Sequence, residues 1–245
     1  MDFVIGTFSC KKYWARLRNM IGSVQANWLD HPPIIVYDIG LTKDQAEHVT
    51  KFAGVKACIK VPPFVPHWRK HYTWKTWIWN NLLNHADAFF ALDAGLSVLK
   101  SMPEVLYQLE AIGYFVASHK HSMTEEVTLA HCKGCNLPPE FRNGKPMLNA
   151  GMVGFSQRYR AIVEEILEVA SVEENIAPDG SVIHPRWEQA ILTTIMHKRI
   201  GDRLIYGDQD FYMRWEDGAV VGQKIWQHRK AKNALIHEPI IKTDL

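Results

Sequence analysis

The chain has 245 residues, 47% of them hydrophobic and 22% charged, with a formal net charge of +2. These proportions are those of a folded globular protein and exclude an intrinsically disordered chain. Because the net charge is small, bulk electrostatics predicts no nucleic-acid partner. No apolar run approaches the roughly 20 residues of a membrane-spanning helix. The four cysteines are too few and too scattered to form a disulfide scaffold.

The N-terminal residues lack the basic segment and the long apolar core of a secretory signal peptide, so we expect a cytoplasmic protein. Basic residues cluster at two places, residues 67–71 and residues 227–232. Such clusters suit phosphates or the inner face of a membrane, and they fit an ordinary solvated surface equally well. Peripheral membrane association therefore stays open at this point, as does the oligomeric state.

Strands and helices alternate along the N-terminal part of the chain. Strands are predicted over Phe3–Ile5, Ile34–Asp38 and Lys56–Val61. Helices are predicted over Lys11–Trp28, over Lys43–Phe52 with Thr42 as the N-cap, and over Thr73–Asn84. The last helix leads to an apolar strand that ends at Asp93. This rhythm predicts an α/β fold with a Rossmann-like, mostly parallel central sheet flanked by helices.

The rest of the chain is predicted to form a single domain with this sheet. Helices are expected over Glu104–Ala111, over Arg158–Ala170 and after Pro185, and strands over Gly113–Ala117 and Val153–Phe155. Residues 119–147 lack periodicity and contain several glycines and prolines. We expect an irregular segment there, which in a compact domain is usually a lid or acceptor-binding loop, or is disordered. No repeat, low-complexity tract or linker divides the chain.

Polar residues are predicted at one edge of the sheet, because parallel strands joined by right-handed crossovers end together. Of these, Asp93 follows an apolar strand, where a carboxylate is costly to bury unless it is bound. One interpretation is that Asp93 caps the following turn. The other is that it binds a ribose or a divalent cation, since hard oxygen ligands suit Mg²⁺ and Mn²⁺. The spacing alone is compatible with both.

The segment Leu92-Asp93-Ala94-Gly95 resembles the Asp-x-Asp motif of GT-A nucleotide-sugar glycosyltransferases, in which a buried strand ends in Leu-Asp-x-Asp. Three further segments resemble motifs of the glycogenin-like and bacterial galactosyltransferase group (glycosyltransferase family 8): Tyr72–Lys75, Asn149–Phe155 and Arg186–Ala190. Their order along the chain is kept. The resemblance implies a GT-A-like fold and transfer of a sugar from a nucleotide-diphosphate sugar to a hydroxyl of a glycan or glycolipid acceptor.

The resemblance also implies roles for individual residues. Residues 1–118 would form the nucleotide-binding half, and residues 119–245 the acceptor-side half with a C-terminal tail. Gln189 would lie near the reacting sugar carbon of a retaining enzyme, whereas Glu188 would be the general base of an inverting one. The residues expected to bind the donor are Thr7, Phe8, Ser9, Asp38, Lys75, Asn149, Ala150 and Gly151. Turn geometry for Asp38 and Asn149, and favourable helix electrostatics for Glu188, are the competing structural explanations.

One position departs from the motif, because Gly95 stands where the second carboxylate is expected. A divalent ion, Mn²⁺ or Mg²⁺, neutralises the diphosphate in such sites and would need another ligand beside Asp93. His228 and His237 are candidates. Alternatively, Arg229 contacts the diphosphate directly. A solvated basic tail would account for all three residues without any ligand.

Aromatic and cysteine residues indicate further possibilities. Nine tryptophans are many for this length, and aromatic side chains that flank a cleft commonly grip sugar rings, although many will be core residues. Cys132 and Cys135 form a single Cys-x-x-Cys pair. Zinc sites of this kind usually use a second pair, so zinc binding, a redox role and ordinary loop residues all stay open.

Two other functions compete with glycosyl transfer. Gly95 favours a catalytically silent protein that binds a nucleotide sugar or a glycan. A nucleotidyltransferase of related fold would carry a glycine-rich, basic loop after the first strand to hold a triphosphate. Residues 6–10, Gly-Thr-Phe-Ser-Cys, do not resemble such a loop.

Overall fold

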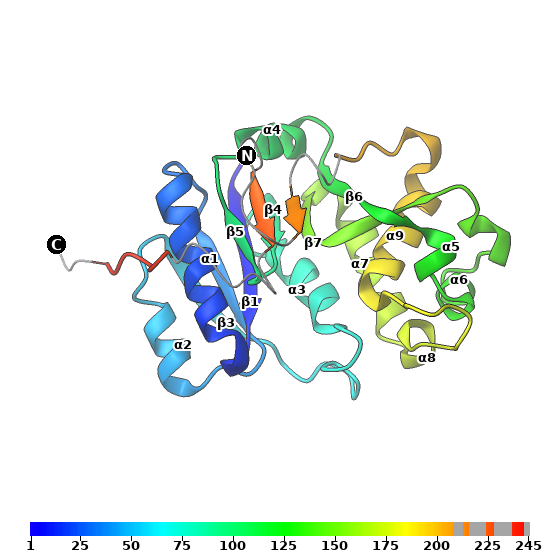
Figure 1. Ribbon diagram of the computed structural model, residues 1–245, viewed down its shortest axis with the longest axis horizontal. Coiled ribbons are helices and arrows are strands. Elements are labelled where there is room, and N and C mark those ends of the chain that lie inside the picture. The colour runs from blue at the N-terminus through cyan, green and yellow to red at the C-terminus, as the bar shows by residue number, and fades with distance from the viewer. Residues whose placement is uncertain (208–212, 216–223, 228–236, 243–245) are drawn as a thin grey trace.

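A six-stranded sheet runs through the computed structural model, which describes residues 1–207, 213–215, 224–227 and 237–242 (Figure 1). The strand order is β3–β2–β1–β4–β7–β6. The strands are β1 (Phe3–Ser9), β2 (Ile34–Asp38), β3 (Val55–Lys60), β4 (Ala88–Leu92), β6 (Tyr114–Ser122) and β7 (Pro146–Ser156). The first four are parallel to one another, whereas β7 is antiparallel to both β4 and β6. The predicted mostly parallel, Rossmann-like sheet is therefore confirmed.

Helices cover both faces of the sheet and complete one α/β domain (Figure 1). One face packs against α3 (Trp74–Leu82), α7 (Arg160–Ala170) and α9 (Trp187–Ile200). The other packs against α1 (Trp14–Asn27), α2 (Lys43–Val49) and α4 (Pro103–Ala111). The shorter helices are α5 (Met123–Glu126), α6 (Leu129–Gly134) and α8 (Glu173–Ile176), with 3-10 turns at Lys11–Tyr13, Pro139–Arg142, Gln157–Tyr159 and Gly201–Arg203.

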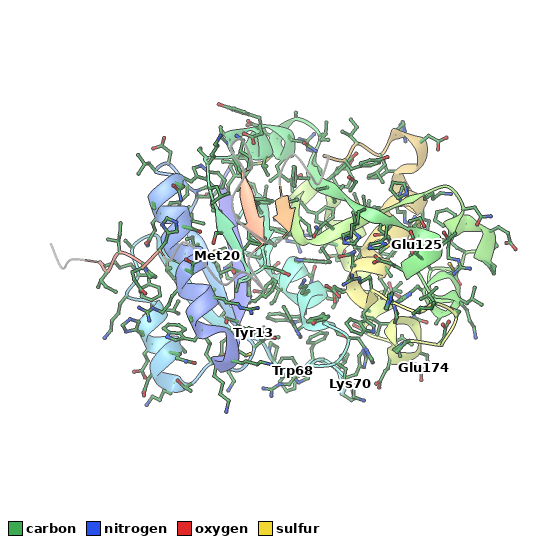
Figure 2. The ribbon with its side chains drawn as sticks, viewed as in Figure 1. Tyr13, Met20, Trp68, Lys70, Glu125 and Glu174 are labelled. Carbon is green, nitrogen blue, oxygen red and sulfur yellow. The ribbon has the colours of Figure 1, made fainter. Side chains whose placement is uncertain are left out.

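Side chains that point alternately to the two faces of the sheet explain why two cores form. In β4, Phe89 packs into the core beneath α3 and α7, whereas Phe90 packs into the core beneath α1 and α4. Successive side chains of a strand point to opposite faces, so a continuous apolar run fills both cores. Each large apolar side chain buried in this way contributes about 1.5–3 kcal/mol. Figure 2 shows the side chains that fill these layers.

The ends of three parallel strands meet at one edge, as the sequence predicts. Register pairs Ser9 at the end of β1 with Asp38 at the end of β2. Asp93 follows directly after β4, which lies on the other side of β1. The middle of the antiparallel β7 reaches the same place, because the Asp93 N–H donates to the Gly151 carbonyl at 2.9 Å. Residues far apart in the chain thus come together at this edge.

The expectation of an irregular segment over residues 119–147 is wrong. β6 continues to Ser122, α5 and α6 follow, and β7 begins at Pro146. Both short helices are stabilised by capping boxes, Ser122 with Glu125 and Thr128 with His131. Helices of one or two turns show no amphipathic repeat, so periodicity alone does not reveal them.

A second, smaller sheet lies beside α1. It consists of β5 (Leu96–Val98), β9 (Ile225–Gln227) and β8 (Met213–Trp215), in the order β5–β9–β8. β5 is held to α1 by a hydrogen bond from the Val98 N–H to Ser23 Oγ at 2.9 Å. None of the described helices combines the length and hydropathy required to span a membrane.

Candidate active site

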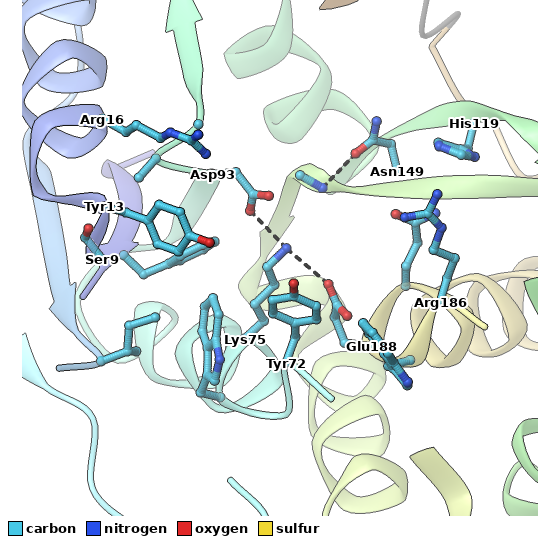
Figure 3. A pocket seen from close by; sticks show the side chains of 18 residues that line it. Ser9, Tyr13, Arg16, Tyr72, Lys75, Asp93, His119, Asn149, Arg186 and Glu188 are labelled. Atoms are coloured by element: carbon cyan, nitrogen blue, oxygen red, sulfur yellow. Dashed lines mark hydrogen bonds and ion pairs between the residues drawn. The ribbon is translucent and has the colours of Figure 1, made fainter. Parts of the chain in front are cut away.

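A pocket of about 230 Å³ opens at the edge where the strands end (Figure 3). Its walls come from β1, from the starts of α1, α3 and α9, and from the segment after β4. Three cationic side chains line it, namely Arg16, Lys75 and Arg186, together with the carboxylates of Asp93 and Glu188. The lining therefore carries one positive charge in excess, which suits an anionic ligand.

Lys75 joins the two carboxylates in a buried ion triad (Figure 3). Its Nζ lies 2.9 Å from Asp93 Oδ1 and 3.1 Å from Glu188 Oε1. The same atom donates to the Ala150 carbonyl at 3.4 Å. The three charged side chains are less than a tenth exposed. The first turn of α3 thereby links the end of β4 and the middle of β7 to the start of α9.

The charges of the triad depend on one another. Burial lowers the pKa of Lys75, but the Asp93 and Glu188 carboxylates outweigh this effect and raise it above its ordinary value. Burial raises the pKa of Glu188, and the Lys75 ammonium opposes that rise. A buried charge is tolerated only with a partner. Lys75 is therefore an ammonium ion at neutral pH and pairs with both acids.

The Asn-Ala-Gly segment of β7 packs against Asp93. The Gly151 N–H donates to Asn149 Oδ1 at 2.7 Å. A Cβ atom at Gly151 would lie 3.0 Å from that oxygen and 3.5 Å from Asp93 Oδ2. Because both contacts would be tight or close, a glycine here lets Asn149 and Asp93 approach each other.

Gln189 is fixed to β7 by backbone contacts. Its Oε1 accepts a hydrogen bond from the Ala150 N–H at 3.3 Å. Thr193, one turn later, accepts from the Leu148 N–H at 3.0 Å and donates to the Gln189 carbonyl at 2.7 Å. Gln189 Nε2 is buried and has no hydrogen-bond partner among the described residues. An unused donor on a pocket wall is suited to a ligand oxygen.

Aromatic rings line one side of the pocket. The Tyr72 ring lies 5.3 Å from the Trp187 ring and 5.9 Å from the Trp74 ring, measured between centroids. His71 and Tyr72 both have left-handed backbone conformations, with φ of 53° and 55°. This conformation costs about 1–2 kcal/mol for a residue other than glycine. Two consecutive strained residues beside a pocket point to a functional use of the exposed Tyr72 side chain.

Most of the predicted site residues lie together. Those that line the pocket are Phe8, Ser9, Lys75, Asp93, Asn149, Gly151, Glu188 and Gln189. The Ala150 backbone joins them through its contacts with Lys75 and Gln189. Thr7 is fully buried in β1, one residue before the lining begins.

The other predicted residues lie elsewhere. Asp38 does not line the pocket, and its Oδ1 accepts from the backbone N–H groups of Gly40 at 2.7 Å and Leu41 at 2.5 Å, as a turn residue does. His237 lies beside α1, where its N–H donates to Asn19 Oδ1 at 2.8 Å. His228 and Arg229 lie outside the described residues.

The basic residues of the lining that were not selected from the sequence are Arg16, His119 and Arg186. Arg186 directly precedes the Glu188–Gln189 pair, and His119 belongs to a His-x-His pattern, so both carried a local signal. Arg16 is one of several basic residues on a helix and had no distinguishing pattern. Cys132 and Cys135 are buried in apolar clusters, which is the ordinary structural interpretation of that pair.

Among the solved structures that share this architecture are two glycosyltransferases. Mouse xyloside xylosyltransferase 1, in its apo form, matches with a TM-score of 0.59 and 11% identity, covering 94% of this chain and 97% of that chain. This chain has a GT-A-like fold. The bifunctional glycosyltransferase WbbM matches with a TM-score of 0.58 and 12% identity, covering 86% of this chain and 39% of that one. The sequence matches no protein-family model and no curated protein.

Proposed function

We propose that this chain is a glycosyltransferase that moves a sugar from a nucleotide-diphosphate sugar to a hydroxyl of a glycan or glycolipid. The observation that carries the proposal is the buried Asp93–Lys75–Glu188 triad on the wall of a pocket at the edge of a GT-A-like sheet. Ligands of open α/β folds bind at this edge. The two glycosyltransferases of the same fold support the reaction class.

In our proposal, residues 1–118 bind the nucleotide, with Phe8 and Ser9 at the nucleoside. Lys75 and Arg16 then supply the positive charge that stabilises the leaving diphosphate. The described residues beside Asp93 do not fit a Mg²⁺ or Mn²⁺ site, because Gly95 offers no side chain and Asp93 Oδ1 already lies 2.9 Å from an ammonium. In our proposal the Lys75 ammonium occupies the position beside Asp93 that a metal ion takes when the motif has two carboxylates.

The reacting sugar is proposed to lie against Asn149 and Gln189, whose Nε2 would donate to a sugar oxygen. During transfer the bond from the anomeric carbon to the phosphate oxygen breaks, and a bond to the acceptor oxygen forms. In an inverting reaction Glu188 takes the acceptor proton, a role that suits a carboxylate whose pKa is raised by burial. In a retaining reaction Gln189 lies beside the reacting carbon. The anomeric configuration of the product distinguishes the two.

The acceptor is proposed to stack on Tyr72 and Trp187, with residues 119–245 forming the acceptor-side half. Aromatic faces bind the apolar faces of sugar rings, and Tyr72 is 45% exposed. The strain at His71 and Tyr72 supports this assignment, because the surrounding structure maintains it at a cost.

Thermal-shift screening against a panel of nucleotide sugars, in the presence of EDTA, tests the proposal. A ligand that binds the folded protein raises its melting temperature in proportion to its affinity. We expect one donor to raise the melting temperature without added metal, and the same donor to be turned over when glycan acceptors are supplied. Binding without turnover would identify a silent binding protein instead. If nucleoside triphosphates stabilise the protein and no nucleotide sugar does, the nucleotidyltransferase alternative is correct.

A further inference from the structure

A second group of titratable side chains lies beyond the triad, on the C-terminal half of the sheet. His119 and His121 come from β6, and Glu126 from α5 directly after it. His119 also lines the pocket, so the group lies next to the pocket wall. In Figure 2, Glu125 is labelled on the right-hand side of the molecule, to the right of Tyr13.

Local geometry brings the three side chains together. His119 and His121 are two residues apart on a strand, so they point to the same face, and their rings stack at 5.1 Å. The capping box of Ser122 and Glu125 turns the chain into α5 and carries Glu126 back over that face. His119 Nδ1 lies 3.6 Å from Glu126 Oε2, and His121 Nε2 lies 4.0 Å from Glu126 Oε1.

The Glu126 carboxylate is only partly satisfied. It is 2% exposed, and its Oε1 accepts from Arg186 Nε at 3.1 Å. Its Oε2 is buried and has no hydrogen-bond partner among the described residues. A buried carboxylate oxygen without a donor is costly, and this one faces His119 Nδ1 at 3.6 Å.

We propose that His119, His121 and Glu126 bind a divalent transition-metal ion of the Zn²⁺ class. Two imidazole nitrogens and one carboxylate oxygen form a ligand set that suits Zn²⁺ rather than Mg²⁺. One ligand atom from each residue can be chosen so that all lie within 4.8 Å of one another, and no other such group of three occurs in the described part of the chain. Ligands about 2.0–2.1 Å from a tetrahedral ion are about 3.3–3.4 Å apart, so these side chains need to close only slightly.

Neighbouring residues orient the ligands, and the site is open to solvent on one side. His121 Nδ1 lies 3.5 Å from Glu125 Oε1, a contact that would hold the His121 ring with Nε2 toward the ion. Arg186 fixes the other oxygen of Glu126. The His121 side chain is 35% exposed, so an ion can enter from solvent and keep one position for water or an acceptor oxygen. This site does not depend on the proposed sugar transfer, and it is separate from Asp93.

Zinc binding to EDTA-treated, desalted protein, measured by competition with a chromophoric chelator, tests the proposal. We expect one equivalent of Zn²⁺ per chain, and at least a 100-fold loss of affinity in H121A and in H119A. E125Q should weaken binding about 10-fold through loss of orientation. H85A, which changes a histidine that contacts Asn81, is the matched control and should bind as the wild type does.

Two measurements distinguish the loss of a metal ligand from unfolding of the variant. Circular dichroism must show that H121A, whose side chain is partly exposed, remains folded. Co²⁺ added in place of Zn²⁺ should give the visible absorption of a four-coordinate site in the wild type and not in H121A. Absence of stoichiometric binding by the wild type, or equal affinity of the wild type and H121A, overturns the proposal. Neither result requires a donor sugar, so failure here is distinct from failure of the proposed enzyme.

Discussion

Two groups of this protein stabilise buried carboxylates in different ways: the Asp93–Lys75–Glu188 triad, and the group of His119, His121 and Glu126. Asp93 and Glu188 share a cation that the chain itself provides, the Lys75 ammonium. Glu126 has Arg186 on one oxygen, and its other oxygen faces the imidazole of His119. Each acid of the first group contacts an ammonium, whereas in the second group one carboxylate oxygen has no hydrogen-bond donor among the described residues and can accept a positive ligand. The difference shows that a carboxylate alone does not indicate a metal, because its neighbours decide what it can bind.

Substitution of Lys75 should have the largest effect on stability. We expect Lys75→Met to lower the free energy of unfolding by about 3–5 kcal/mol, because two buried carboxylates lose their partner. Urea denaturation at pH 7 measures this loss. Lys70→Met is the matched control, since Lys70 pairs with Glu173 at 3.0 Å on the surface and should change stability little. Equal effects of the two substitutions would contradict the distinction between the triad and an ordinary ion pair.

Asp93→Asn should leave the fold intact and reduce turnover of the donor about 100- to 1,000-fold, because Lys75 loses one of the two carboxylates that position its ammonium in the pocket. Initial rates with the nucleotide sugar found by screening measure the effect. Asp38→Asn is the control, since its carboxylate holds a turn outside the pocket, and a change of no more than a few-fold is expected. Unchanged turnover of Asp93→Asn would remove Asp93 from the mechanism.

Acid should destabilise the C-terminal half through His131. Burial lowers the pKa of His131 to about 4, so the folded protein keeps this ring neutral while the unfolded chain binds a proton below about pH 6.5. The stability contributed by the neutral ring is therefore complete above pH 6.5 and lost as the pH falls toward 4, by up to about 3 kcal/mol. Urea denaturation at pH 7 and pH 5 should show this slope, and His131→Asn should make it smaller. An unchanged slope in the variant would assign the effect to other groups.

The smallest effects should come from the aromatic residues on the rim of the pocket. Tyr72→Gly should weaken the acceptor interaction by up to about ten-fold, since stacking contributes about 0.5–1.5 kcal/mol. Tyr72→Gly should be more stable than Tyr72→Ala, because both lose the ring and only glycine adopts the left-handed conformation without strain. Acceptor KM and urea denaturation measure the two effects. Tyr107→Ala, at an exposed site on α4, should change neither KM nor stability appreciably. Equal stability of Tyr72→Gly and Tyr72→Ala would refute the assignment of strain.

Much of the framework is readable from consecutive residues. The strand over Ile34–Asp38, the Thr42 cap and the helix after Pro185 are observed where the pattern places them. Apolar periodicity and capping chemistry act within a few residues, so a single sequence reveals them. The same locality explains the failure over residues 119–147, where two short helices depend on capping boxes and on packing.

By itself, the sequence determined the α/β class, the sheet edge that Asp93 reaches and the separate identities of Lys75, Glu188 and Gln189. Only the tertiary structure decided their relations. It pairs one lysine with two acids from distant elements, reverses β7 so that Gly151 meets Asp93, and sets Arg186 on Glu126. Such contacts depend on strand register and on the packing of helices far apart in the chain. Residue type shows what a side chain can do, whereas its partner, set by the fold, decides what it does.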